Sequence, residues 1–166
     1  MEATRFGTDP AGRISQQGDF RGKAKVTLNV FFDSSALAKR YIEEKGSHQV
    51  QVILSSASSL AVSVICVPEI VSALCRRRRE RKLSIEEYRN ARASVISDID
   101  DATVIGLTEE VIGQAVALLE QFPLRSADAL HVACASAWST DLFASADARQ
   151  CTAARAHGLR VEGIRV

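Results

Sequence analysis

The sequence lacks any apolar run long enough to cross a membrane. Hydrophobic residues make up 46% of its 166 residues, but no uninterrupted stretch of them approaches the roughly 18 to 20 residues that span a bilayer. The first 25 residues carry charges throughout, where a secretory signal peptide would have an apolar centre. We therefore expect a soluble, cytoplasmic protein with no contact to a membrane.

Cysteine pairs are also lacking. The four cysteines fall at irregular spacings with no C-x-x-C pair, at Cys66, Cys75, Cys134 and Cys151. This pattern favours neither a zinc site nor a disulfide framework. We expect reduced, buried thiols.

Several catalytic motifs are absent. There is no G-x-S-x-G elbow and no G-x-x-x-x-G-K-[ST] loop, which excludes a serine hydrolase of that type and a P-loop NTPase. Asp33 is followed two residues later by Ser35, where an aspartyl-phosphate phosphatase of the haloacid dehalogenase type needs a second Asp. A receiver domain would have an acidic pair after its first strand, and no such pair occurs here.

The length and composition indicate one globular domain. With 25% charged residues, the chain is close to an average soluble protein and long enough to bury one core. Residues 1–25 hold four of the nine glycines and few apolar side chains, so they cannot bury enough surface to offset the entropy of ordering. We expect a flexible extension over 1–25 and a folded domain over 26–166.

Strand and helix patterns alternate along this domain. Apolar, β-rich runs predict strands over 26–32, 60–65, 103–107, 141–145 and 160–164. Helical spacing predicts helices over 34–45, 47–57, from Pro68 to the arginine run, 85–99, 109–121, from a cap at Ser126 onward, and 148–157. Such alternation is typical of the α/β class, in which helices cover both faces of a parallel sheet.

Acidic residues lie near the ends of these predicted strands. Asp33 directly follows the first strand, Glu69 follows the second by a few residues, and Asp147 follows the fourth by about two. Asp128 lies in the first turn of the helix that leads into the fourth strand. A single Asp in such a place is typically an N-cap or turn former. However, the carboxyl ends of parallel strands share one edge, where ligands bind, so the joint placement predicts an acidic crevice.

Four carboxylates in one crevice indicate a cation site. Packing them together raises their pKa values unless a cation neutralises them, and hard divalent ions such as Mg²⁺ or Mn²⁺ prefer carboxylate oxygens. One or two such ions can activate water and stabilise the charge of a phosphoryl transition state. The sequence therefore predicts hydrolysis of phosphodiester bonds.

Four short motifs carry a family resemblance. They are Asp33-Ser34-Ser35-Ala36-Leu37, Pro68-Glu69-Ile70, Arg125-Ser126-Ala127-Asp128-Ala129-Leu130-His131-Val132-Ala133 and Ser145-Ala146-Asp147. In order and spacing, over roughly residues 28–164, they resemble the motifs of PIN-domain ribonucleases, most closely the VapC-like toxins of type II toxin-antitoxin pairs.

The resemblance implies a three-layer α/β/α fold with a central parallel sheet of four to five strands. It implies a Mg²⁺- or Mn²⁺-dependent endoribonuclease that acts on RNA, forms a homodimer, and binds a small cognate antitoxin in its acidic cleft. Matched position by position, the catalytic and metal-binding acids are Asp33, Glu69, Asp128 and Asp147, and Ser145 is the hydroxyl residue that supports them.

The arginine run and His131 each allow two interpretations. Between residues 76 and 82 there are six basic residues and one acidic residue. Arg76, Arg77, Arg78 and Arg79 could contact RNA phosphates or could form a solvated helix end. His131 lies three residues after Asp128, so it is a conceivable proton shuttle, but a polar residue near the cleft without a catalytic role is the simpler interpretation.

The alternative function is a non-catalytic PIN-like scaffold that binds RNA or a protein. Such a module has no reason to retain four mutually repelling carboxylates.

Overall fold

The computed structural model describes residues 27–166, which form a five-stranded parallel sheet. Its strands are β1 (Asn29–Phe32), β2 (Ser59–Ser63), β3 (Thr103–Ile105), β4 (Leu142–Ser145) and β5 (Val161–Gly163). Their spatial order is β3-β2-β1-β4-β5, and every neighbouring pair is parallel. The predicted α/β class is confirmed, whereas the expected extension over 1–25 lies outside the described residues.

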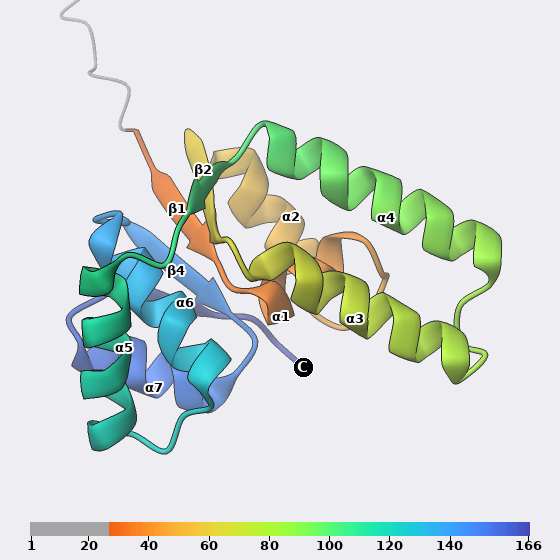
Figure 1. The fold of residues 1–166 in the computed structure, drawn as a ribbon. Coiled ribbons are helices and arrows are strands. Elements are labelled where there is room, and N and C mark those ends of the chain that lie inside the picture. The colour runs from red at the N-terminus through yellow and green to blue at the C-terminus, as the bar shows by residue number, and fades with distance from the viewer. Residues whose placement is uncertain (1–26) are drawn as a thin grey trace, which may run out of the picture.

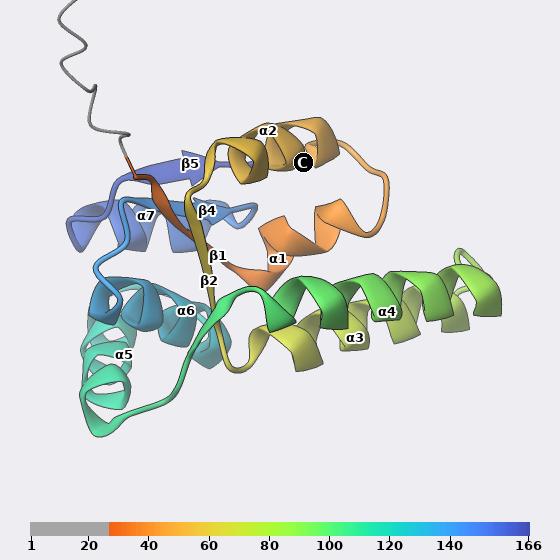
Figure 2. The same ribbon diagram turned by 90° about the horizontal axis from the view of Figure 1, so that it is seen from above.

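Helices cover both faces of this sheet (Figures 1 and 2). One face carries α1 (Ser34–Leu37), the 3-10 helix η1 (Ala38–Arg40), α2 (Ser47–Ser56), α3 (Cys66–Arg79) and α4 (Ile85–Asp100). The other carries α5 (Glu109–Gln121), α6 (Ser126–Ala137) and α7 (Ala148–Ala156). This is the expected three-layer α/β/α arrangement. Within residues 27–166, none of the helices has the length and apolar character needed to cross a bilayer.

The central strand divides the core into two halves. Val30 and Phe32 of β1 pack among the side chains of α1 to α4, while Phe31 packs among those of α5 to α7. Successive side chains of a strand point to opposite faces, so a strand covered on both sides is apolar throughout. Phe31 also lies opposite Phe143 of β4, with their rings stacked at 5.9 Å between centroids.

One predicted helix is wrong in its extent. The pattern predicts a single helix over 34–45, but the helical backbone ends at Arg40 and a turn follows. Side chains hydrogen-bond to backbone carbonyls in and beside this turn: Ser47 Oγ donates to Lys39 O at 2.7 Å, and Lys39 Nζ donates to Lys45 O at 3.0 Å. Such local bonds between side chains and backbone compete with the helix.

The remaining predicted elements are present, with ends shifted by at most three residues. The N-terminal cap of α6 differs from the prediction, because Ser126 is its first helical residue and not its cap. Asp128 instead reaches back and accepts a hydrogen bond from the Arg125 amide at 3.1 Å, as an acid at the third helical position often does.

Candidate active site

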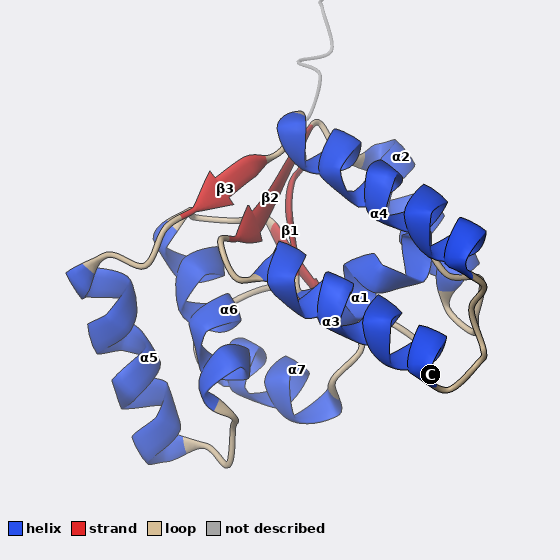
Figure 3. Ribbon diagram, turned by 45° about the vertical axis from the view of Figure 1, so that its right-hand side comes forward, coloured by secondary structure: helices blue, strands red, loops and turns tan. Residues whose placement is uncertain are grey.

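The four predicted acids line one open cleft of about 510 Å³. Asp33 follows β1 directly, Glu69 and Asp128 lie in the first turns of α3 and α6, and Asp147 is the N-cap of α7 just after β4. Figure 3 shows α1 and α3 beginning where β1 and β2 end. The acids thus meet at the carboxyl edge of the sheet, where the topology of a parallel α/β fold places binding sites.

Asp33 is the most deeply buried of the four, with 2% of its surface exposed. Its carboxylate accepts hydrogen bonds from the Ala36 amide at 2.9 Å and from Ser35 Oγ, which lies 2.7 Å from Oδ2. Burial raises the pKa of Asp33, and the nearby His131 and these donors offset that effect only in part. Without a cation, the ionised form of Asp33 therefore destabilises the folded state.

Glu69 is half-buried and has two side-chain partners. Its Oε2 accepts a hydrogen bond from Ser34 Oγ at 2.7 Å and lies 2.6 Å from His131 Nε2. Burial alone would raise the pKa of Glu69, but the hydrogen bonds from His131 and Ser34 outweigh it and lower the pKa. Glu69 is therefore a carboxylate at neutral pH.

Asp147 is held by backbone amides at the start of α7. Its Oδ1 accepts from the amides of Arg149 at 2.8 Å and Gln150 at 3.1 Å. Burial acts to raise the pKa of Asp147, yet the amides of Gln150 and Arg149 bring it below its usual value. The fully buried Ser145 accepts from the Asp147 amide at 3.0 Å, so it fixes the backbone that carries this acid.

The expectation that clustered carboxylates raise one another's pKa is wrong for two of the acids. The pKa is raised at Asp33, where burial is the largest cause, and lowered at Glu69 and Asp147. The physical reason is that Glu69 and Asp147 each have their own donors, which stabilise the charged form more than burial penalises it.

The donor chemistry of the cleft fits a hard divalent ion. All four acids offer carboxylate oxygens, the ligands that Mg²⁺ and Mn²⁺ prefer. As they stand, no three His, Cys, Asp or Glu side chains within residues 27–166 are grouped to hold a metal ion. Mg²⁺ commonly keeps several waters and binds through one or two carboxylates. Asp33, whose charge is the most deeply buried, is the acid that a cation would stabilise most.

The arginine run of α3 does not form one continuous surface. Arg76 and Arg77 line the acidic cleft, and Arg77 forms an ion pair with Glu44. Arg78 instead places its guanidinium 5.1 Å from the ring centroid of Tyr88 on α4. Within residues 27–166, Arg76 has no ion-pair partner, which leaves its charge available in the cleft.

Three contacts in the cleft went beyond the sequence-based expectations. Ser34 and Ser35 belong to the first motif, but no role was predicted for them; their place directly after Asp33, in the first turn of a helix, is the signal that could have indicated one. Ser35 Oγ donates to Asp33 and accepts from the Ala146 amide at 3.0 Å, which joins the ends of β1 and β4. His131 contacts Glu69 directly, with 2.6 Å between Nε2 and Oε2, a contact that the sequence analysis did not predict.

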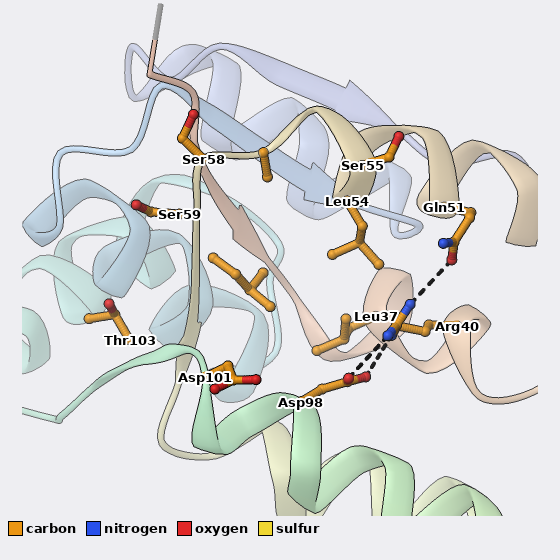
Figure 4. Close-up of a pocket in the computed structure, with 12 residues that line it drawn as sticks. Leu37, Arg40, Gln51, Leu54, Ser55, Ser58, Ser59, Asp98, Asp101 and Thr103 are labelled. Carbon is orange, nitrogen blue, oxygen red and sulfur yellow. Dashed lines mark hydrogen bonds and ion pairs between the residues drawn. The ribbon is translucent and has the colours of Figure 1, made fainter. Parts of the chain in front are cut away.

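A second cavity, of about 470 Å³, lies between α2, α4 and the start of β2 (Figure 4). Arg40 crosses it and binds Asp98 on one side and Gln51 on the other, with 3.2 Å between Arg40 Nη1 and Gln51 Oε1. None of the four predicted acids lines this cavity. The acidic cleft is therefore the stronger candidate for the active site.

Solved structures share this fold at low sequence identity. The Sarcin-Ricin loop cleaving toxin VapC20 of Mycobacterium tuberculosis is 18% identical, with a TM-score of 0.59 over 82% of this chain and 99% of that chain. VapBC2 of Rickettsia felis, bound to a DNA fragment from its promoter, is 10% identical, with a TM-score of 0.60 over 82% of this chain and 98% of that chain. FitAcB of Neisseria gonorrhoeae is 15% identical, with a TM-score of 0.60 over 80% of this chain and 95% of that chain.

The family assignment comes from the sequence itself. Among curated proteins, no sequence matches the chain. The sequence profile of the PIN domain matches residues 30–156, a span that contains all four acids of the cleft, β2 to β4, and β1 from Val30 onward. The chain therefore belongs to the PIN domain family.

Proposed function

We propose that this protein is a metal-dependent endoribonuclease and the toxin of a toxin-antitoxin pair. One observation carries the proposal: four carboxylates from four separate segments line a single cleft at the carboxyl edge of the sheet. Membership of the PIN domain family and the likeness of the fold to VapC toxins support it.

In this proposal, Mg²⁺ or Mn²⁺ is held by Asp33, Glu69, Asp128 and Asp147. Such an ion, when bound, stabilises the charge that develops on a phosphoryl group during hydrolysis. The chain's own residues keep the acids in place for it. Ser35 and the Ala36 amide fix Asp33, and Ser145 fixes the backbone of Asp147.

RNA is the proposed substrate. An acidic cleft repels a polyanion unless cations near it contact the phosphates, and clustered arginines supply that contact. Of the four arginines predicted to bind RNA, Arg76 is best placed, because it lines the cleft and has no ion-pair partner within the described residues. Arg77 lines it too but is paired with Glu44. Among similar structures, VapC20 is described as cleaving the Sarcin-Ricin loop.

The proposed partners are a cognate antitoxin protein and a second copy of the chain. Several structures of similar fold are toxin-antitoxin assemblies, which supports an antitoxin partner. A cytoplasmic site of action agrees with the cysteines, because Cys66, Cys75, Cys134 and Cys151 are all free thiols and three of them are buried.

The test is cleavage of a pool of structured RNA by protein purified free of antitoxin. Cleavage is expected with Mg²⁺ or Mn²⁺, and none with EDTA or with Asp33→Asn. Glu120→Gln, at an exposed acid of α5 outside the cleft, is the control and should cleave like the wild type. A folded wild type that binds RNA but cuts none of the pool under any metal condition would favour the non-catalytic scaffold.

A further inference from the structure

His131 is buried inside the protein beside the cleft. It lies on α6 with 1% of its surface exposed, and its ring forms a T-shaped pair with that of Phe31, with 6.4 Å between centroids. From this position Nε2 reaches Glu69 Oε2 at 2.6 Å. The contact joins α6 to α3 across the acidic cleft.

The two partners of Glu69 bind the same oxygen. Ser34 Oγ donates to Oε2 at 2.7 Å, and His131 contacts Oε2 as well. Within residues 27–166, no hydrogen bond reaches the other oxygen, Oε1. One oxygen of Glu69 is therefore anchored from two elements, and the other is left unpaired.

The contact with Glu69 shows where one ring proton lies. Glu69 is a carboxylate, so its Oε2 can only accept, and the 2.6 Å contact places a donated proton on His131 Nε2. The other ring nitrogen, Nδ1, is buried and has no hydrogen-bond partner in the described part of the chain. With its proton donated to Glu69, Nε2 has no lone pair to accept a proton from substrate or water, so the arrangement does not favour His131 as a general base.

We infer that His131 is a positioning residue of the cleft: together with Ser34 it fixes Glu69 through Oε2 and leaves Oε1 available to a divalent cation. This inference rests on the proposed function. Hydrogen bonds from a second layer of residues orient ligating carboxylates, and losing one such partner typically weakens metal affinity about 10- to 100-fold.

The first experiment measures Mn²⁺ binding to the full chain by isothermal titration calorimetry, without RNA. His131→Leu removes the donor and should weaken Mn²⁺ binding about 10- to 100-fold. His131→Gln keeps an amide donor at the place of Nε2 and should bind within a few-fold of the wild type. Thermal melts in EDTA report whether each variant is folded. If His131→Leu does not fold, Ser34→Ala takes its place, because it removes the other donor to Oε2 and should likewise weaken Mn²⁺ binding relative to the wild type.

The second experiment repeats the substitution in a Glu69→Gln background. If His131 acts through Glu69, His131→Leu should cause no further loss of Mn²⁺ affinity there, because coupled residues are non-additive. An equal loss in both backgrounds would show a merely structural role and overturn the inference.

The outcomes separate this inference from the proposed function. A wild type that binds no Mn²⁺ overturns both. A wild type that binds Mn²⁺ no more tightly than folded His131→Leu overturns the role of His131 alone and leaves the proposed nuclease intact.

Discussion

The guanidinium of Arg40 binds both carboxylate oxygens of Asp98, with Nε 2.5 Å from Oδ2 and Nη2 3.0 Å from Oδ1. This two-point contact joins η1 to α4 across 58 residues of sequence. The hydrogen bond from Arg40 is the largest cause of the lowered pKa of Asp98, ahead of the opposing effect of burial. The contribution of this ion pair to folding stability therefore depends on pH.

We expect Asp98→Asn to lower the free energy of unfolding by about 1 kcal/mol at pH 7, the upper range for partly exposed pairs. Because the pKa of Asp98 is depressed in the folded state, its contribution is full above the unfolded value of about 3.9 and is lost as the pH falls through the folded pKa. Urea denaturation at pH 7 and at pH 2 to 3 measures the difference, which should shrink in acid. Asp101→Asn, at an exposed residue with no ion pair within the described residues, should cause no comparable loss.

Asp33→Asn should stabilise the metal-free protein at neutral pH. The pKa of Asp33 is raised in the folded state, so its contribution to stability changes with pH in the opposite direction to that of Asp98. The stabilising contribution of the protonated acid is full below about pH 3.9 and is lost as the pH rises through the folded pKa. Urea denaturation in EDTA should therefore show a variant that exceeds the wild type at pH 7 and matches it near pH 3. Added Mn²⁺ should stabilise the wild type and not the variant; a variant that is less stable than the wild type in EDTA at pH 7 would contradict this account of Asp33.

Gly46→Ala should be strongly destabilising. Gly46 has φ +96°, and a Cβ there would lie 2.4 Å from the Arg165 carbonyl oxygen and 2.7 Å from Ile164 Cγ2. The left-handed backbone and the clash together should cost about 3 kcal/mol in unfolding free energy. Gly158→Ala is the matched control, because Gly158 has φ +91° and a Cβ added there would have no neighbour within 4 Å among residues 27–166. It should cost only about 1 to 2 kcal/mol, and equal losses at the two glycines would show that the contact with Ile164 and Arg165 is unimportant.

Arg76→Ala should weaken RNA binding uniformly across sequences. Losing one phosphate contact lowers the slope of log affinity against log salt concentration by about 1. Fluorescence anisotropy in EDTA, which prevents the proposed cleavage, measures both the affinity and the slope. Arg79→Ala is the control, since Arg79 is an exposed member of the same run that does not line the cleft. Identical slopes for the two variants would assign the basic run to general electrostatic attraction.

The order of the elements and the gathering of the acids could be predicted from the sequence because both depend on local signals. A strand such as β1 is apolar throughout, and the residue that follows it lies at the ligand-binding edge of any parallel sheet. Asp33 and Asp147 could thus be placed without knowledge of a single tertiary contact.

The rest depends on side chains that are distant in the sequence. No periodicity shows that His131 meets Glu69, because the contact depends on the relative placement of α3 and α6. The early end of the first helix depends likewise on bonds that Lys39 and Ser47 make within a turn. The division of the arginine run could have been foreseen, since neighbouring residues of a helix are about 100° apart and consecutive arginines must face different partners.

The first strand of the described chain occupies the centre of the sheet, and its partner β4 begins more than a hundred residues later, with Phe31 opposite Phe143. A chain emerging from the ribosome therefore holds Asp33 long before it can place Asp147 beside it. Pairing between such distant segments is slow to form and waits for the later one. The nascent chain therefore cannot assemble the four-acid cleft until nearly the whole domain has been synthesised.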